Sequence, residues 1–223
     1  MLASAMTDVY FDFLCPYAWR GLELANVLRA LPGDAGGETF RLRHFSLAQG
    51  NHPDNAAAKG AGDVRWWLSD QPQGEGAAHQ QSSLDAFLAH TAAARQGEER
   101  SWAFALALFR RRHEHGQALD EAAIQGAAGD AGLDTAQFAA DRQDDGGLRA
   151  ALRRELEEAA DLGVFGTPTF VLEDGGAAYY RFENLTRDPQ TARAWWDLYR
   201  TVLDSGAGIA TIKRARNRPA KKA

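Results

Sequence analysis

The chain has very little cysteine and no long hydrophobic run. Cys15 is the only cysteine in 223 residues, which excludes an internal disulfide framework and favours a reducing cytoplasm as the compartment. No run of about 18 apolar residues occurs, so we expect no membrane span. Residues Met1 to Thr7 have no basic start and no apolar core, and therefore do not resemble a secretory signal. The sequence predicts a cytoplasmic protein without a membrane partner.

Positive charge is scarce over most of the chain. The net charge is −5, with 25 Lys and Arg against 30 Asp and Glu. An acidic body repels nucleic acid, so we expect no nucleic acid partner. The basic end of the chain is either a solvated, partly disordered tail or a segment that binds an anion or the acidic body. Its cations are Lys213, Arg214, Arg216, Arg218, Lys221 and Lys222.

The N-terminal segment predicts two strands on either side of a helix. Residues Asp8 to Leu14 mix β-branched and aromatic side chains, as a central strand does. Pro16 suits the first turn of a helix, which we expect to run to Ala30. Apolar side chains then alternate from Thr39 to Leu47. This order predicts a second strand, parallel to the first and joined to it by a right-handed crossover.

The middle of the chain predicts a long loop and then a block of helices. Residues 48–76 are rich in Gly, Asn, Asp, Gln and Pro, with room for one short helix. Trp66 and Trp67 in this loop either line a pocket or anchor the loop to the core. Residues 77–162 contain no proline and no strand pattern. We expect helices over 78–95, 98–115, 121–131, 135–141 and 148–162.

The β pattern returns after Gly163. Thr167-Pro168 begins a strand or lies in a tight, cis turn, because proline removes a donor from a sheet. A hairpin at residues 174–176 predicts a returning strand from Ala177 to Phe182. A last helix is predicted from Pro189 to Asp204. We expect its buried side to be formed by Ala192, Trp195, Trp196, Leu198, Tyr199 and Val202.

Cys15 is the strongest candidate for chemistry. It lies between a predicted strand and a predicted helix, where unpaired N–H groups and the helix dipole favour a thiolate. The alternative is a small buried hydrophobic residue, as most single cysteines are. The histidines are too scattered to predict a metal site. They are His44, His52, His79, His90, His113 and His115.

Two motifs and their separation resemble the DsbA-like branch of the thioredoxin superfamily. The motifs are DFLCPYAW at residues 12–19 and LGVFGTPTFV at residues 162–171, with the helical block between them. The resemblance implies an α/β thioredoxin fold, with a mixed sheet, helices on both faces and an all-helical insertion domain. The thioredoxin parts would span 7–56 and 163–205, the insertion 57–162, and the basic tail 206–223.

Two branches of that family are similar to this chain. The first includes the mycothiol-dependent nitroreductases and is favoured. It is indicated by Phe45-Ser46-Leu47-Ala48 with Asn51, by residues 180–198 and by the tail segment Ile212-Lys213-Arg214-Ala215-Arg216. The second comprises the kappa-class glutathione transferases and the 2-hydroxychromene-2-carboxylate isomerases, which the motif at residues 15–19 resembles.

The resemblance implies a thiol-disulfide oxidoreductase with Cys15 as its nucleophile. Ala18 stands where dithiol members have a second cysteine, so no internal disulfide can form. What remains is monothiol exchange with a low-molecular-weight thiol as co-substrate, namely glutathione, mycothiol or bacillithiol, without a tightly bound cofactor or metal. The implied thiol-binding residues are Pro16, Tyr17, Ala18, Trp19, Gly166, Thr167 and Pro168, although Trp19 fits a core position equally well.

Three functions remain open at this stage. In the first, Cys15 exchanges disulfides with the small thiol and a disulfide or electrophilic substrate. In the second, Cys15 binds and polarises the thiol for conjugation or isomerisation. In the third, the scaffold without a second cysteine is a redox-inactive binding module. The protein would be a monomer or a homodimer.

Overall fold

The computed structural model of the chain describes residues 6–32, 37–203 and 208–209. Apart from residues 208 and 209, the predicted basic tail lies outside the described residues. The described part holds a four-stranded sheet with the order β2-β1-β3-β4. Its strands are β1 (Met6–Phe11), β2 (Thr39–His44), β3 (Thr169–Val171) and β4 (Ala177–Tyr179).

The sheet is mixed. Strands β1 and β2 are parallel, with Val9 opposite Leu42, and are joined through helix α1 (Pro16–Arg29). Strand β3 lies antiparallel to β1, with Phe170 also opposite Val9, and β4 lies antiparallel to β3. The predicted parallel pair and the predicted hairpin are both confirmed.

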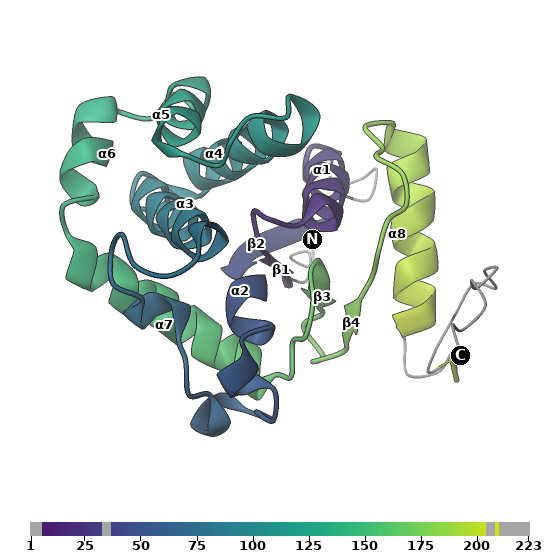
Figure 1. Ribbon diagram of the computed structural model, residues 1–223. Coiled ribbons are helices and arrows are strands. Elements are labelled where there is room, and N and C mark those ends of the chain that lie inside the picture. Colours follow the sequence, from purple (N-terminus) through teal and green to yellow (C-terminus); the bar gives the residue numbers. More distant parts are fainter. Residues whose placement is uncertain (1–5, 33–36, 204–207, 210–223) are drawn as a thin grey trace, which may run out of the picture.

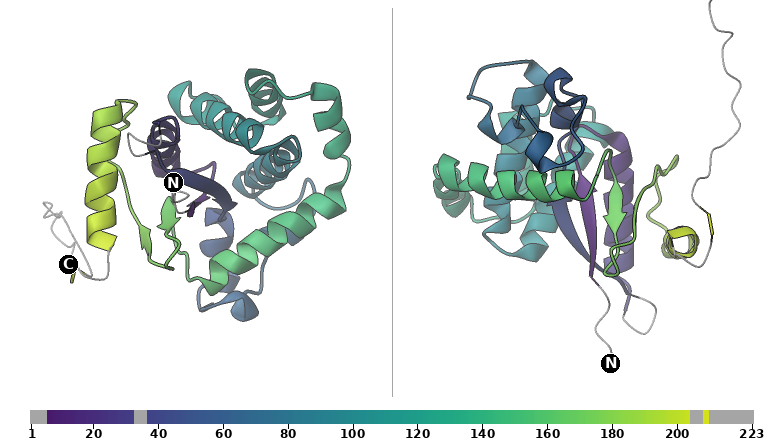
Figure 2. Two further views of the ribbon diagram at one scale, coloured as in Figure 1. Left: turned by 180° about the vertical axis from the view of Figure 1, so that it is seen from behind. Right: turned by 90° about the horizontal axis from the view of Figure 1, so that it is seen from below.

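A block of helices separates β2 from β3 in the sequence. Figure 1 shows this block on one side of the sheet, and helix α8 (Pro189–Leu203) beside β4 on the other side. Figure 2 shows the same separation from behind and from below. None of the described helices is long and apolar enough to cross a membrane. The block comprises α2 (Leu47–Gly50), 3₁₀ turns at Pro53–Asn55, Ala61–Asp63 and Leu68–Asp70, and α3 (Ala78–Ala94), α4 (Glu98–Phe109), α5 (Glu121–Asp130), α6 (Thr135–Asp141) and α7 (Asp145–Asp161).

Helices pack on both faces of the sheet. On one face, Trp196 of α8 contacts the rings of Phe40 and Phe170 at centroid distances of 5.1 and 5.2 Å. On the other face, Tyr10 belongs to a smaller buried cluster that includes Ala159 of α7. The architecture is therefore the predicted α/β thioredoxin fold with a helical insertion.

Two strands end earlier than the apolar pattern predicts. Strand β1 ends at Phe11 instead of Leu14, because the Asp12 carboxylate accepts the Leu14 N–H at 2.8 Å and turns the chain. Strand β2 ends at His44 instead of Leu47, because the Ser46 hydroxyl accepts the Gln49 N–H and begins α2. Local hydrogen bonds from Asp and Ser side chains compete with the sheet here.

Three further expectations are wrong in detail. Helix α4 ends at Phe109, and residues Arg110–Glu114 form a π-helix instead of continuing it. Helix α7 begins at Asp145, so Gly146 and Gly147 lie inside it, because Asp144 caps its first turn. Leu198 is 56% exposed, although the pattern of α8 predicts it on the buried side.

Trp67 anchors the long loop after β2. Its ring is buried, and the Arg153 guanidinium of α7 lies 3.8 Å from the ring centroid. Trp66 stacks on His52 at 4.3 Å. The buried Asn55 amide donates to the carbonyl of Trp66 at 2.7 Å and closes this part of the loop. The loop is thus held by its own side chains against α7.

Candidate functional site

Cys15 lies at the turn between β1 and α1. It is the N-cap residue of α1, and Pro16 occupies the first helical position. The Cys15 N–H donates to the Asp12 carbonyl at 3.0 Å, and the Cys15 carbonyl accepts the Trp19 N–H at 3.2 Å. Only 6% of the residue is exposed. The sulfur therefore sits where the dipole of a 14-residue helix favours negative charge.

The second predicted motif meets Cys15 in space. The Cys15 thiol donates to the Thr167 carbonyl oxygen at 3.3 Å, across 152 residues of sequence. The Thr167-Pro168 peptide bond is cis. Thr167 is buried, and no described residue gives its hydroxyl oxygen a hydrogen-bond partner. The Thr167 carbonyl oxygen thus lies in the immediate surroundings of the thiol.

Gly21 lets α1 approach this segment, and sequence reasoning missed it. A Cβ on Gly21 would lie 2.7 Å from Cγ of Pro168, closer than real side chains pack. A similar restriction holds at Gly166, where a Cβ would lie 3.1 Å from the ring of Tyr179. The sequence did contain a signal for this contact. Glycine lowers the stability of a helix, so a glycine inside a predicted helix indicates that a neighbouring segment packs closely there.

The other predicted site residues divide between surface and core. Pro16 is exposed, and Tyr17 is half-buried with its ring 4.6 Å from the Arg181 guanidinium. Ala18 is fully buried. Trp19 turns toward the helical block: it stacks on His113 at 6.0 Å, and its ring N–H donates to Glu23. Tyr17 therefore borders the surface near Cys15, while Trp19 contacts the insertion.

Asp12 holds the turn that presents Cys15. Its carboxylate is fully buried and accepts the N–H groups of Leu14 at 2.8 Å and Leu47 at 2.6 Å. Burial raises the pKa of the Asp12 carboxyl to about 6, against these two hydrogen bonds and the nearby His44, which lower it. Asp12 thereby joins the end of β1, the Cys15 turn and the start of α2.

Glu23 is a buried charge that the sequence did not reveal. Its carboxylate is 1% exposed and accepts paired hydrogen bonds from Arg110 and Arg187, with shortest distances of 2.7 Å for each arginine. Burial raises the pKa of Glu23, but the hydrogen bonds and charges of the two arginines outweigh it and hold the pKa at about 2. Glu23 thus ties α1 to the π-helix and to the segment before α8.

Two histidines that look scattered in the sequence form a buried pair. Nε2 of His44 lies 2.7 Å from Nδ1 of His90, and Nε2 of His90 lies 2.9 Å from the Ser101 hydroxyl. Nδ1 of His44 lies 2.8 Å from Glu155. Burial, with the charge of His44, lowers the pKa of His90 to about 3, so His90 is neutral. Within the described ranges, no three His, Cys, Asp or Glu residues are grouped as metal ligands require.

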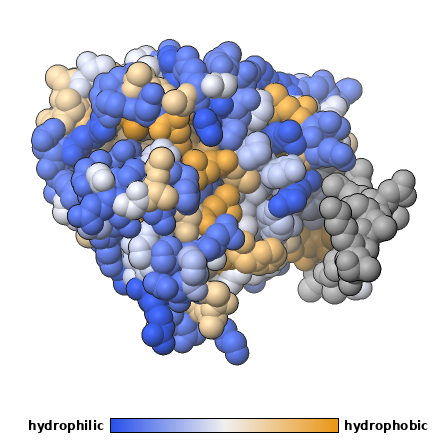
Figure 3. Space-filling model, in the orientation of Figure 1, coloured by the Kyte–Doolittle hydropathy of each residue, from blue (hydrophilic) through white to orange (hydrophobic). Residues whose placement is uncertain are grey.

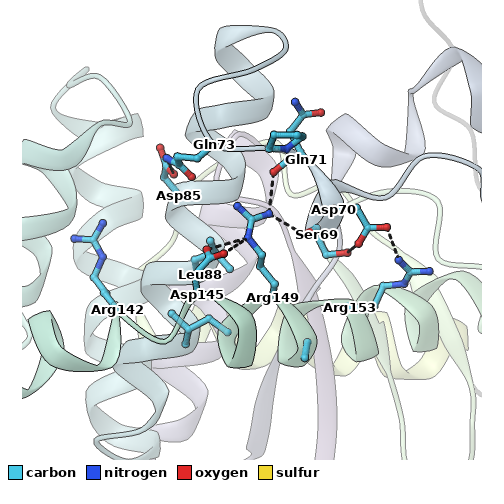
Figure 4. A pocket seen from close by; sticks show the side chains of 13 residues that line it. Ser69, Asp70, Gln71, Gln73, Asp85, Leu88, Arg142, Asp145, Arg149 and Arg153 are labelled. Carbon is cyan, nitrogen blue, oxygen red and sulfur yellow. Dashed lines mark hydrogen bonds and ion pairs between the residues drawn. The ribbon is translucent and has the colours of Figure 1, made fainter.

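One cavity lies away from Cys15, where arginine side chains of α7 contact the loop after β2. It measures about 800 Å³. Figure 4 shows Arg149 donating to the carbonyls of Ser69 and Gln71, and Arg153 paired with Asp70. Because Arg149 and Arg153 already bond to groups of the protein itself, the cavity offers little free positive charge for an anionic ligand.

A smaller cleft of about 320 Å³ begins at Tyr17 and lies near the Cys15 turn. Leu198, an apolar residue that lines the cleft, is 56% exposed. Phe165, two residues before Thr167, is 75% exposed. Figure 3 shows one face of the molecule, on which hydrophobic residues gather near the centre within a hydrophilic surround. Exposed apolar surface of this kind is typical of binding regions.

Comparisons with known proteins identify the family and the fold. A family model described as a DSBA-like thioredoxin domain matches residues 6–197. No curated protein matches the chain.

Solved structures with the same fold cover nearly the whole chain. A probable DsbA oxidoreductase from Streptomyces coelicolor is 19% identical over 95% of this chain and 94% of that chain, with a TM-score of 0.56. The cytosolic disulfide reductase DsbM from Pseudomonas aeruginosa, with GSH, is 19% identical over 87% and 98%, with a TM-score of 0.54. A 2-hydroxychromene-2-carboxylate isomerase is 19% identical over 88% and 97%, also with a TM-score of 0.54.

Proposed function

Because the chain belongs to the family of DsbA-like thioredoxin domains, we propose that it is a thiol-disulfide oxidoreductase that works with a single cysteine and a low-molecular-weight thiol. The observation that carries this proposal is the position of Cys15. Its sulfur lies at the first turn of α1 and 3.3 Å from the Thr167 carbonyl, with Ala18 in the place of a second cysteine. This arrangement suits attack on a disulfide but provides no internal resolving thiol.

The exchange takes two balanced steps. The Cys15 thiolate attacks one sulfur of an oxidised small thiol, a new sulfur–sulfur bond forms, and the other half leaves as a thiolate. A substrate thiolate then attacks the small-thiol sulfur of the mixed disulfide, which releases a disulfide between the substrate and the small thiol and regenerates the Cys15 thiolate. With such a mixed disulfide as the substrate, the same two exchanges run in reverse: the substrate leaves as a thiolate in the first, and a second small thiol leaves as the oxidised small thiol in the other. The helix dipole favours the Cys15 thiolate in both steps.

The backbone beside Cys15 suits a peptide-like thiol. In the resting protein the Thr167 carbonyl oxygen accepts a hydrogen bond from the Cys15 thiol. Once Cys15 is part of a mixed disulfide, this oxygen is free to accept a hydrogen bond from an N–H group of the ligand. An extended ligand that pairs with this backbone would be held in the way that an added strand is held. Pro16, Tyr17 and Gly166 would border such a ligand.

The identity of the thiol is tested by a panel. The reduced protein is incubated with oxidised glutathione, oxidised mycothiol and oxidised bacillithiol, and the adduct is located by intact mass and peptide mapping. We expect one adduct, on Cys15, that a reduced small thiol removes. The Cys15→Ser variant is the control and should form none. A wild-type protein that stays unmodified at neutral pH with all three disulfides contradicts the proposal.

A second candidate follows from the absence of another cysteine. Without an internal resolving thiol, Cys15 can also serve as a binder that polarises a small thiol for conjugation or isomerisation, as in the kappa-class transferases that the motif at residues 15–19 resembles. The two functions differ in their products. Exchange gives a mixed disulfide on Cys15, whereas conjugation gives a thioether of the small thiol and leaves Cys15 unmodified.

A further inference from the structure

The cleft near Cys15 has one polar rim and one aromatic wall. It lies between α1, the segment that follows β4 and α8, with a volume of about 320 Å³. That volume is at the small end of the range for sites that enclose small molecules. The residues that matter for its chemistry are Tyr17 and Arg20 of α1, Tyr180, Arg181 and Phe182 after β4, and Trp195 of α8.

Arg181 differs from the other arginine of the cleft in its contacts. Arg20 donates to the carbonyls of Phe182 at 3.2 Å and Glu183 at 2.8 Å, so it serves to hold the segment after β4. Arg181 is exposed and donates through Nε to the Tyr179 hydroxyl, a neutral partner. In the part of the chain that the structure describes, no carboxylate forms an ion pair with Arg181. Its guanidinium lines the cleft together with the carboxylate residue Glu183, without an ion pair between the two.

Arg181 is also tied to the Cys15 site. Its guanidinium lies 4.6 Å from the ring centroid of Tyr17, two residues after Cys15. The preceding residue, Tyr180, donates its N–H to the Pro168 carbonyl at 3.2 Å, next to the carbonyl that accepts the Cys15 thiol. The hydrogen bond to Tyr179 is the main cause of a raised pKa at Arg181, and Tyr17 and Cys15 add to it through charge. Arg181 therefore lies against the ring of Tyr17, next to the Cys15 turn, and directly follows a residue bonded to Pro168.

Three aromatic residues in contact with one another also line the cleft. Phe182 and Trp195 stack at 5.9 Å with an angle of 13° between their planes, and Tyr180 packs on Phe182 at 5.0 Å. Aromatic rings of this kind offer a flat surface for the carbon skeleton of a small ligand at low entropic cost. The cleft thus combines one available cation with apolar contact area.

We propose that Arg181 binds a carboxylate of the small thiol whose sulfur reacts at Cys15. The cleft then selects thiols that carry carboxylates, the class to which glutathione and bacillithiol belong, over mycothiol, which has none. This inference rests on the proposed function and deepens it. Arg181 acts as an anion-binding residue for the ligand and takes no part in bond formation.

Binding is tested first with a probe that cannot exchange. S-methylglutathione is titrated against the wild-type protein and Arg181→Met, with tryptophan fluorescence as the readout because Trp195 lines the cleft. We expect Arg181→Met to raise the Kd about tenfold, as loss of one charge-assisted hydrogen bond does. Arg154→Met, at an exposed position of α7, is the matched control and should leave the Kd unchanged. Equal affinity in the wild type and Arg181→Met overturns the inference.

Reactivity then separates this inference from the proposed function. The rate of Cys15 modification is measured with oxidised glutathione and with the uncharged 2-hydroxyethyl disulfide. We expect Arg181→Met to slow the first reaction about tenfold and leave the second within twofold. An equal loss with both disulfides would mean that Arg181 acts on the thiol and not on the ligand, which overturns the inference. Failure of the wild type to react with either disulfide removes the proposed function, while the S-methylglutathione result still decides the role of Arg181.

Discussion

Pro168 packs against Gly21, and this contact sets how closely α1 approaches the segment that carries the Thr167 carbonyl. A Cβ at Gly21 would lie 2.7 Å from Cγ and 3.0 Å from Cβ of the proline ring. Where α1 packs against this segment, the Cys15 sulfur lies 3.3 Å from the Thr167 carbonyl oxygen. The site therefore depends on a position that carries no chemistry of its own.

We predict that Gly21→Ala destabilises the protein and loosens the site. The added methyl group must push the proline ring away, at a cost of about 1–3 kcal/mol that the better helix propensity of alanine only partly offsets. Urea unfolding measures the loss of stability, and the rate of iodoacetamide alkylation reports the altered surroundings of Cys15.

The control for this variant is Gly129→Ala in α5. A Cβ at Gly129 meets nothing within 4 Å, so only helix propensity changes. We expect this control to be neutral or to gain up to about 1 kcal/mol. If the two alanine variants have the same stability, the packing between α1 and Pro168 is not as tight as the distances imply.

The variant Ala18→Cys should gain a redox-active disulfide. Ala18 is buried in the first turn of α1, three residues after Cys15, where dithiol relatives have their second cysteine. We expect the oxidised form of the variant to be two hydrogens lighter in intact mass than its reduced form. With dithiothreitol as the reductant, the reduced variant should reduce a disulfide substrate such as insulin, which the wild type should do much more slowly. The double variant Cys15→Ser/Ala18→Cys is the control. An Ala18→Cys protein that never forms the internal disulfide would indicate a turn geometry unlike that of dithiol members.

The sequence predicts most of the fold and the two segments of the Cys15 site, because each element and each segment has a recognisable local sequence pattern. A proline after a cysteine begins α1, and Thr167-Pro168 precedes the short strand β3. What brings these segments together was visible only as a resemblance. The contact between Cys15 and Thr167 spans 152 residues, and no local rule relates positions so far apart.

The features that were missed are long-range pairings of charged or polar groups. Glu23 lies in a helix whose sequence gives no sign of a buried charge, yet it pairs with Arg110 and Arg187, which are 87 and 164 residues away. His44 and His90 likewise meet from different elements. Leu198 fits the buried side of α8 by periodicity, yet it lines the cleft beside Arg181. Periodicity predicts which face of a helix or strand is apolar, but not which residues of other elements contact that face.

Glu23→Gln should destabilise the protein strongly. The buried carboxylate compensates two arginines, and an amide leaves their charges poorly paired, at a cost of about 2–3 kcal/mol because both arginines keep some contact with water. The charged form of Glu23 is favoured in the folded state, with its pKa held at about 2, so its contribution is present at neutral pH and is lost as the pH falls toward 2. Chemical denaturation at pH 7 measures the effect.

Glu99→Gln is the matched control for Glu23→Gln. Glu99 also pairs with an arginine, Arg29, but its side chain is 83% exposed. We expect a change of about 0.5 kcal/mol or less, since exposed ion pairs contribute little. A similar small change for Glu23→Gln would mean that the three-way pairing adds no more than a surface pair.

Asp12 should make the stability of the protein fall as the pH rises from about 4 to about 6. Burial raises the pKa of this carboxyl from its ordinary value near 4 to about 6 in the folded state. The folded protein therefore holds a proton in this range that the unfolded chain has lost, and stability decreases with rising pH by roughly 2–3 kcal/mol in all. The measurement is the difference in unfolding free energy between the wild type and Asp12→Asn at each pH from 4 to 7.

That difference isolates Asp12, because the other titrating groups are common to both proteins. Asparagine cannot ionise, but it can accept only one of the two N–H groups, from Leu14 and Leu47, that the carboxylate accepts. Asp12→Asn should therefore be less stable than the wild type at pH 4. The difference in unfolding free energy between the two proteins should become smaller by pH 7, because the wild type then holds a buried charge. For Glu173→Gln, at an exposed position, the difference in unfolding free energy from the wild type should be the same at every pH. A difference for Asp12→Asn that does not change with pH would show that the carboxyl titrates normally, and that its buried hydrogen bonds balance the cost of burial.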